Sequence, residues 1–404
     1  MHNLTKIRVY RILLYISYVP ALFLMWPLAL LRKKNRGHLF FFFDRTALGG
    51  AQRIHLDLLK SIAQEPKQIY FTRFSADHTL HDAFYTQPNA DVRDIHKWCD
   101  NLFLRLFTVH YFAFYLNRHQ QAHVFSSNST FFYDMLPFLK KRIIKTELLH
   151  MFTFGKKGME FFGLANYKYL DYRIIYDILT RQNLEKQYQE YGVPHAYLKR
   201  MRYIEPGVSV PETFPQKQRS EKLKVLYAGR GGEQKRIWIL NKIAEQCIDA
   251  ALPVEFHFAG TMQDELSEKV KAASVLYGPI AEPAEMEKLN VMADVLLMTS
   301  AYEGFPMAIK EAMAQGCVPV VTALEGNKTH LASGHNSILL EQVTDEEKLV
   351  EEGFSRLKEL AFDRHQLEQL SRAAFNYARQ HFDRTKFYAQ YAQLLQQTTG
   401  PVYQ

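Results

Sequence analysis

The chain has 404 residues, of which 47% are apolar and 14% aromatic, enough for two domains with sizeable hydrophobic cores. Its three scattered cysteines, Cys99, Cys247 and Cys317, exclude a disulfide framework or a cysteine zinc site; we expect them to be buried in a reducing compartment. The net charge of +8 is uneven: residues 1–205 carry 29 basic and 16 acidic side chains, whereas residues 206–404 carry 21 and 26. A basic first half suits an anionic surface or acceptor. Nucleic acid is the alternative partner, but no DNA- or RNA-binding signature supports it.

The first feature along the chain is an uncharged stretch, residues 12–31, with basic side chains on both flanks. Its 20 residues are just enough to span a bilayer, but Pro20 and Pro27 interrupt it. No small-residue cleavage site follows, so a cleaved signal peptide is not expected. A spanning helix and a bent helix in the membrane interface both remain open, against the alternative of a helix packed on a soluble body. We expect membrane association, and a globular body that folds without residues 1–36.

Apolar runs and helical patterns then alternate, which is typical of a parallel α/β sheet. The strands predicted in the first half are residues 38–43, 68–73, 122–127, 143–150 and 173–176. The helices predicted there are residues 54–63, 102–115, 130–141 and 181–191. The helix over 102–115 is so apolar that we expect it to be buried or to face a membrane.

Pro, Gln and charged residues gather after residue 205, and we place a linker over residues 206–222. The alternation then restarts. The predicted strands are residues 223–228, 254–259, 274–277, 295–298 and 318–322, and the predicted helices are residues 236–250, 264–272 and 283–292, with a helical C-terminal third.

The most informative segment is residues 299–316. It follows the apolar strand over 295–298, and a helix is expected to begin at Pro306 and to end at Gly316. Glu303 lies in the loop before that helix and Glu311 about two turns into it. In an open α/β sheet, ligands bind in the loops past the carboxyl ends of the strands.

This segment resembles the E-x7-E signature of retaining glycosyltransferases with the two-domain GT-B fold, especially family 4. The match runs from Glu303 through Pro306 and includes Glu311. The resemblance implies that the loop amides and Glu303 face the donor sugar, and that Glu311 accepts hydrogen bonds from the nucleotide ribose. Without the resemblance, two solvated glutamates would be the simpler reading.

The family's diphosphate clamp is Gly-Arg followed a few residues later by Lys, which corresponds to Gly229, Arg230 and Lys235. Two cations at that point would stabilise the charge that grows on the leaving diphosphate. A pair of surface cations is the alternative. Arg236 stands where the family often has Gly, which leaves the local backbone open.

Three weaker matches complete the resemblance. Gly49 and Gly50 resemble a glycine pair that approaches the donor phosphates, and the turn at Gly278 resembles one beside the nucleobase. His150 ends a predicted strand where the family often places a histidine at the reacting sugar, although the usual Asp partner is replaced by Met151. An ordinary turn or a packed structural histidine is the alternative.

The resemblance implies an α/β chain of the GT-B class, with two Rossmann-like domains facing a cleft and an N-terminal membrane-associated helix. Its parts would be a membrane segment (1–36), an acceptor-side domain (37–205) onto which a helix at 385–397 packs back, the linker (206–222), and a nucleotide-sugar domain (223–384). The residues implied in catalysis are His150, Arg230, Lys235 and Glu303, and those implied in donor binding are Gly49, Gly50, Gly229, Gly278, Gly304, Phe305, Pro306, Met307 and Glu311.

The implied activity is retaining transfer of a sugar from a nucleotide diphosphate-sugar to a lipid-linked or cell-surface polysaccharide acceptor, at the cytoplasmic face of a membrane. No Asp-x-Asp motif is present, so no metal or other cofactor is expected, and nucleic acid is not an expected partner. A nucleotide-sugar epimerase or hydrolase and a non-catalytic binding subunit remain as alternatives.

Overall fold

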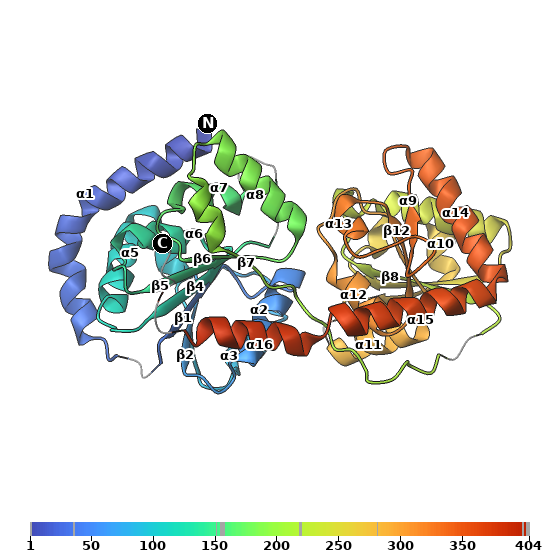
Figure 1. Ribbon diagram of the computed structural model, residues 1–404, viewed down its shortest axis with the longest axis horizontal. Coiled ribbons are helices and arrows are strands. Elements are labelled where there is room, and N and C mark those ends of the chain that lie inside the picture. Colours follow the sequence, from blue (N-terminus) through green and yellow to red (C-terminus); the bar gives the residue numbers. More distant parts are fainter. Residues whose placement is uncertain are drawn as a thin grey trace. The chain divides into compact units, whose positions relative to one another are not determined.

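The computed structural model describes residues 2–34, 37–150, 152–153, 158–217, 220–280, 282–397 and 400 (Figure 1). The chain forms two compact units, Met1–Glu205 with Phe387–Gln404, and Pro206–Lys386. Each unit is built on its own parallel sheet.

The sheet of the first unit has seven parallel strands in the order β3-β2-β1-β4-β5-β6-β7. Their bounds are β1 (Leu39–Phe43), β2 (Lys67–Phe71), β3 (Ala90–Asp94), β4 (His123–Ser127), β5 (Ile144–Leu148), β6 (Tyr172–Ile175) and β7 (Met201–Tyr203). Strand order reverses between β1 and β4, so their carboxyl ends flank the topological switch point, where α/β sheets bind ligands.

Side chains of the central strand β1 alternate between two helical layers. Phe40 and Phe42 pack with α5 and α6 on one face, and Phe41 and Phe43 pack with α2 and α16 on the other. The helices of this unit are α1 (His2–Leu31), α2 (Gly50–Ser61), α3 (His81–Tyr85), α4 (His96–Cys99), α5 (Leu102–Leu116), α6 (Thr130–Met135), α7 (Met159–Asn166), α8 (Ile178–Glu190) and α16 (Arg384–Leu395). Short 3-10 turns follow at Leu136–Phe138 and His195–Arg200.

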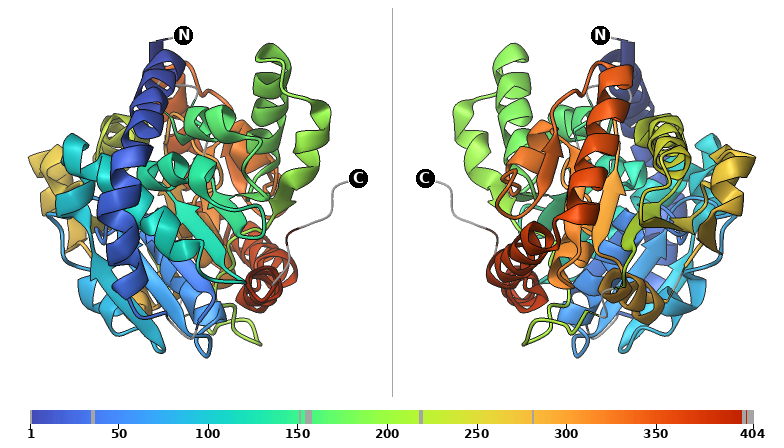
Figure 2. Two further views of the ribbon diagram at one scale, coloured as in Figure 1. Left: turned by 90° about the vertical axis from the view of Figure 1, so that its left-hand side faces the viewer. Right: turned by 90° about the vertical axis from the view of Figure 1, so that its right-hand side faces the viewer.

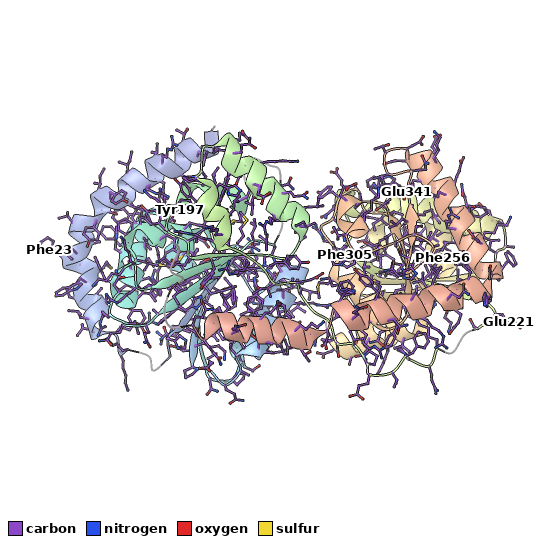
Figure 3. All side chains as sticks on the ribbon, viewed as in Figure 1. Phe23, Tyr197, Glu221, Phe256, Phe305 and Glu341 are labelled. Atoms are coloured by element: carbon purple, nitrogen blue, oxygen red, sulfur yellow. The ribbon has the colours of Figure 1, made fainter. Side chains whose placement is uncertain are left out.

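Helix α1 arcs around the outside of α5 (Figure 1, Figure 2). Leu14, Ala21 and Ala29 of its inner stripe are buried in the same core cluster as β1, and the Ser17 hydroxyl lies 3.0 Å from His110 Nε2 of α5. Its outer face is apolar and exposed. Phe23, which is labelled in Figure 3, lies on this face and is 74% exposed. Within the described residues, Leu4–Leu31 is the one segment long and apolar enough to cross a membrane.

Residues 12–31 therefore pack as part of the first unit. The sequence had led us to expect a segment separate from the body. The reason is the stripe of small residues, since Ala21 and Ala29 let the helix backbone approach α5 closely.

The sheet of the second unit has six parallel strands in the order β10-β9-β8-β11-β12-β13. Their bounds are β8 (Leu223–Gly229), β9 (Val254–Gly260), β10 (Ser274–Gly278), β11 (Val295–Met298), β12 (Val318–Thr322) and β13 (Ile338–Leu340). Here the order reverses between β8 and β11.

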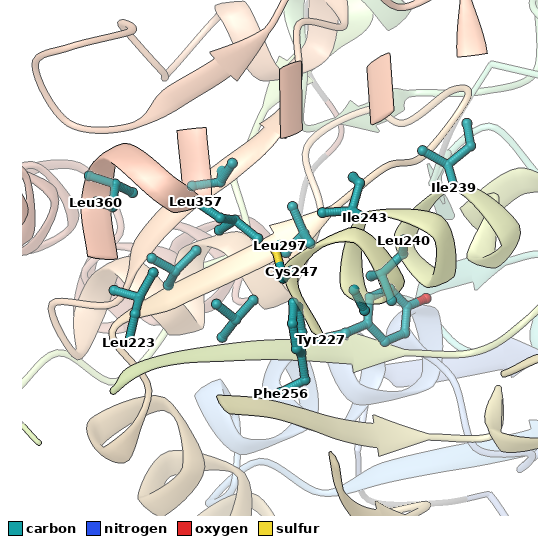
Figure 4. Packing of buried hydrophobic residues seen from close by; sticks show 14 of the residues in the cluster. Leu223, Tyr227, Ile239, Leu240, Ile243, Cys247, Phe256, Leu297, Leu357 and Leu360 are labelled. Carbon is teal, nitrogen blue, oxygen red and sulfur yellow. The ribbon is translucent and has the colours of Figure 1, made fainter. Parts of the chain in front are cut away.

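Strand β11 shows how this sheet is buried on both faces. Val295 and Leu297 join a cluster with α9 and α14 (Figure 4), whereas Leu296 and Met298 join a cluster with α11, α12 and α15. The helices are α9 (Ile237–Asp249), α10 (Glu268–Ala272), α11 (Pro283–Met292), α12 (Met307–Ala314), α13 (Glu325–Lys328), α14 (Glu346–Phe362) and α15 (Arg364–His381), with 3-10 turns η3 (Glu233–Lys235) and η4 (Gln263–Glu265).

All ten predicted strands are present within a few residues of their expected bounds. The three strands that were not predicted, β3, β7 and β13, lie at sheet edges. Edge strands are short and need no continuous apolar run, so the sequence carries little signal for them. The helix predicted over 130–141 ends at Met135, because Pro137 lacks the N–H that would continue it.

Candidate active site

Two loops meet at the switch point of the second sheet, one after β8 and one after β11. Lys235 Nζ lies 2.5 Å from Glu303 Oε1, and both side chains are only 12% exposed. The Ala301 N–H donates to the Gln234 carbonyl at 2.8 Å and fastens the two backbones together. The structure thus brings together two residues that the sequence placed in separate motifs.

Arg230 lies at the solvent edge of the same site. Its Nη2 donates to Gln234 Oε1 at 2.7 Å, and Gln234 Nε2 donates to the Tyr302 carbonyl at 2.9 Å. The Tyr227 hydroxyl donates to the Arg230 carbonyl at 2.6 Å. The backbone of Arg230 is therefore held, while its guanidinium remains exposed toward a ligand.

Arg236 has the left-handed backbone conformation, with φ of 48°, that glycine adopts without strain. Its buried guanidinium donates to the carbonyls of Thr299, Val343 and Ser300, at 2.7, 2.8 and 3.1 Å. Burial lowers the pKa of this guanidinium. The departure from the family's Gly thus keeps a glycine-like backbone, and the arginine side chain binds the β8 loop to the end of β11.

An acidic residue that the sequence did not single out faces the glycine-rich turn after Arg230. The Gly232 N–H donates to Glu265 Oε1 at 2.8 Å, and Gly232 has a φ of 106°. This amide is engaged by a carboxylate, which an incoming anion would have to displace. Glu265 follows β9 and lies in the 3-10 turn η4, inside the span 264–272 that was predicted as a helix, because the α-helix α10 begins only at Glu268.

The loop between β11 and α12, which carries Glu303 and Gly304 and is called the signature loop below, is packed against its surroundings. A Cβ on Gly326 of α13 would lie 1.6 Å from the Gly304 carbonyl oxygen, so this position requires glycine. The Phe305 ring packs on His330 and Phe382, with ring centroids 4.5 and 5.5 Å away. The Phe305 side chain is therefore partly buried and held by two ring contacts.

Helix α12 follows this loop. Pro306 caps it and Met307 is its first residue, one position later than predicted, while Gly316 stops it with a φ of 66°. Glu311, half-buried, lies on the second turn. The turn at Gly278, with φ of 70°, ends the edge strand β10, two strands from β8.

In the first unit, polar side chains gather past the ends of β4, β5 and β6. His150 Nε2 lies 2.7 Å from the Ser127 hydroxyl and 3.0 Å from Nε2 of His55 on α2, and Nδ1 contacts the Tyr176 hydroxyl. Burial lowers the pKa of His150 to about 3 and that of His55 well below its ordinary value, so both rings are neutral. Both ring nitrogens of His150 thus have protein partners.

The glycine pair lies where α2 begins, past the carboxyl end of β1. Gly49 is extended and precedes the helix, and Gly50 is its first residue, with open space where a Cβ would be. The Leu48 N–H donates to Asp77 Oδ2 at 2.7 Å and holds the loop. A helix N-terminus at a switch point favours an anion.

The contacts thus gather Arg230, Lys235 and Glu303 in the second unit, whereas Gly49, Gly50 and His150 belong to the first. The residues that sequence reasoning missed are His55, Ser127, Tyr176, Glu265 and Gly326. Ser127 and Tyr176 end or follow predicted strands, a signal that could have found them. Among the described residues, no group of three His, Cys, Asp or Glu side chains could hold a metal ion.

Residues 222–356 match the family described as glycosyl transferases group 1. The match runs from β8 through the signature segment and so contains Arg230, Lys235, Glu303 and Glu311. The second unit therefore carries a glycosyltransferase domain, and the chain is an enzyme of that class. No curated protein sequence matches the chain significantly.

Solved structures extend the likeness over both units. Anabaena Alr3699/HepE in complex with UDP-glucose is 16% identical with a TM-score of 0.67, over 88% of this chain and 99% of that one. A mutant of S. aureus TarM, in complex with fondaparinux, α-GlcNAc-glycerol and UDP, is 11% identical with a TM-score of 0.66, over 89% and 100%. The lipopolysaccharide outer core galactosyltransferase WaaB is 18% identical with a TM-score of 0.63, over 88% and 99%. These likenesses confirm the predicted GT-B fold.

Proposed function

We propose that the protein is a retaining glycosyltransferase similar to family 4. It would move a sugar from a nucleotide diphosphate-sugar to a hydroxyl of a lipid-linked or cell-surface polysaccharide acceptor, at the cytoplasmic face of a membrane. The observation that carries the proposal is the contact of Lys235 Nζ with Glu303 Oε1. It unites the clamp cation and the signature loop in one site, inside the segment that matches the group 1 family.

In the proposed complex the diphosphate lies against Arg230 and Lys235, and the amide of Gly232 exchanges Glu265 for a diphosphate oxygen. Negative charge grows on the leaving diphosphate as the glycosidic bond breaks, and fixed cations and amides stabilise it. Glu303 holds the Lys235 ammonium in place before the donor arrives, and Glu311 accepts from the ribose hydroxyls. These groups supply the charge without a metal ion, so a chelator should leave transfer unchanged.

Retention follows if the acceptor attacks from the face that the diphosphate leaves. The bond from the anomeric carbon to the diphosphate oxygen breaks, the bond to the acceptor oxygen forms, and a diphosphate oxygen takes the acceptor's proton. His150 would act as a neutral hydrogen-bonding group at the sugar, because burial holds its pKa at about 3. To do so it would exchange one of its present partners for a sugar hydroxyl.

The substrate classes are supported by what the similar structures bind. Alr3699/HepE holds UDP-glucose, and WaaB is described as a lipopolysaccharide outer core galactosyltransferase. The exposed apolar face of α1 supports a lipid-linked acceptor, because such a face is stabilised at a membrane surface.

The test uses full-length enzyme with labelled UDP- and GDP-sugars, with and without a membrane lipid extract. We expect label in the lipid fraction from one donor, with the anomeric configuration of the donor when the product is analysed by NMR. Lys235→Ala should mainly lower turnover, because the charge that Lys235 meets grows in the transition state. Lys269→Ala, on the exposed surface of α10, is the matched control and should be fully active.

Other results of this experiment would identify one of the alternative functions. Free or epimerised sugar formed without lipid would identify a hydrolase or epimerase. Donor binding without turnover under every condition would identify a non-catalytic subunit. A product of inverted configuration would reject retention while keeping the transferase.

A further inference from the structure

A second polar site lies in the first unit, at the carboxyl ends of β1 and β2. It is an open pocket of about 350 Å³. Its lining residues are Arg45, Arg73, Phe74, Cys99, Asp100 and Arg105. Arg45 comes two residues after β1 and Arg73 two residues after β2, so both follow strands at the sheet edge that also carries the Gly49 loop.

Two of the three arginines are available to a ligand. Arg105 is paired, since its Nε and Nη2 contact Asp134 Oδ2 at 2.9 and 2.5 Å. Arg45 Nε is 3.7 Å from Asp44 Oδ2, beyond hydrogen-bonding distance, and Arg73 is exposed. Guanidinium groups that line one pocket have the side-chain chemistry that binds phosphate bidentately.

The acidic side chains at the pocket are engaged or partly buried. Asp100 Oδ2 accepts the Phe74 N–H at 3.3 Å. Asp44 is largely buried, and burial raises the pKa of its carboxyl. A ligand anion would therefore replace weak contacts of Arg45 and Arg73 rather than break strong ion pairs.

The rim of the pocket carries large apolar side chains that are exposed. Large side chains that are more than half exposed gather on the loop after β2, on α4 and at the start of α5, and they are Phe74, Trp98, Leu102 and Phe103. The Arg105 guanidinium also lies over the ring of Tyr10 of α1, 6.0 Å from its centroid. The pocket thus adjoins the helix that carries the exposed apolar face. An anion with an apolar tail matches both parts of this surface.

We propose that this pocket binds the phosphate or diphosphate of a lipid-linked acceptor, with Arg45 and Arg73 on the phosphate and the apolar rim on the first part of the lipid chain. The inference rests on the proposed transferase function and names its acceptor class. Strand β5, which leads to His150, is two strands from β1, a separation of about 10 Å. That separation leaves room for a short saccharide between the phosphate and the acceptor hydroxyl.

The test measures binding by calorimetry, with full-length protein in neutral detergent. The probes are farnesyl diphosphate, inorganic diphosphate and farnesol. We expect farnesyl diphosphate to bind at least about tenfold more tightly than either fragment, and Arg45→Gln/Arg73→Gln to weaken it by about tenfold or more. Arg181→Gln, on exposed α8, removes a similar charge and should change nothing. Binding of UDP should be the same in all three proteins.

Unchanged farnesyl diphosphate affinity in the double variant would overturn the proposal, as would an equal loss in Arg181→Gln. A third arm measures binding to phosphatidylglycerol vesicles, which the double variant should retain. If it instead loses vesicle binding and keeps farnesyl diphosphate, the pocket contacts membrane headgroups and the acceptor assignment is wrong. If the double variant binds farnesyl diphosphate normally and the enzyme still transfers sugar to lipid, the pocket assignment is wrong but the proposed function stands. The two proposals can therefore be rejected separately.

Discussion

Glu311 tests the donor site at the scale of a single residue. Glu311→Ala should weaken binding of the nucleotide by about 1.5–3 kcal/mol, because the ribose hydroxyls would lose a charged acceptor. Calorimetry with UDP and GDP measures this difference. Glu268→Ala, on the exposed surface of α10, is the matched control. Unchanged affinity in Glu311→Ala would reject the ribose assignment.

The buried, neutral histidines should make the free energy of unfolding depend on pH. Burial lowers the pKa values of His150 and His123 to about 3, so the folded state stays unprotonated where the unfolded state binds protons. Stability should therefore fall as pH falls below about 6.5, by about 2 kcal/mol per histidine between pH 7.5 and pH 5. Urea unfolding across this range measures the loss. The slope should become shallower in His123→Gln if that variant folds, and an equal slope would contradict the assignment.

At the scale of elements, the signature loop depends on the start of α13. Gly326→Ala places a methyl group 1.6 Å from the Gly304 oxygen, so the loop must move. We expect a cost of about 1–3 kcal/mol in unfolding free energy and weaker UDP binding. Thermal melting and calorimetry separate the two effects. Gly304→Ala is the control for stability, since its Cβ would meet nothing within 4 Å.

Substitutions on the two faces of helix α1 should have different effects on membrane binding and on melting temperature. Phe23→Glu changes a side chain that is 74% exposed and should release the protein from membranes without lowering its melting temperature. Ala21→Glu places a charge at a fully buried position and should destabilise the first unit. Fractionation and melting together measure the contrast. Full-length protein that is wholly soluble without detergent would reject the membrane role.

At the scale of the whole molecule, the two units should respond differently to loss of α1. The sequence predicted that the body folds without residues 1–36, whereas the burial of Leu14, Ala21 and Ala29 in the core favours the opposite outcome. A chain that begins at Gly37 should lose the cooperative melting of the first unit, because α5 would expose the surface that α1 covers. The second unit, with its own core, should still bind nucleotide. A truncated chain with unchanged melting would show that α1 is dispensable for folding.

Most of the strands, and the loop and helix that follow β11, could be predicted from the sequence alone. Strands buried on both faces, such as β1 and β11, leave continuous apolar runs that can be read locally. A loop followed by a helix is predicted by the residue types of Glu303, Gly304 and Pro306 alone. The structure also confirms the prediction that all three cysteines are buried, which rested on cysteine behaving as a small apolar side chain.

Which of these residues contact one another could be seen only in the folded chain. Lys235 and Glu303 are 68 positions apart, and their contact depends on β8 and β11 being neighbours in the sheet. The pairing of His55 with His150 and the burial of one face of α1 likewise depend on how helices pack on sheets. Local propensity and spacing do not encode such contacts, because they arise from register and packing between segments that are distant in the chain.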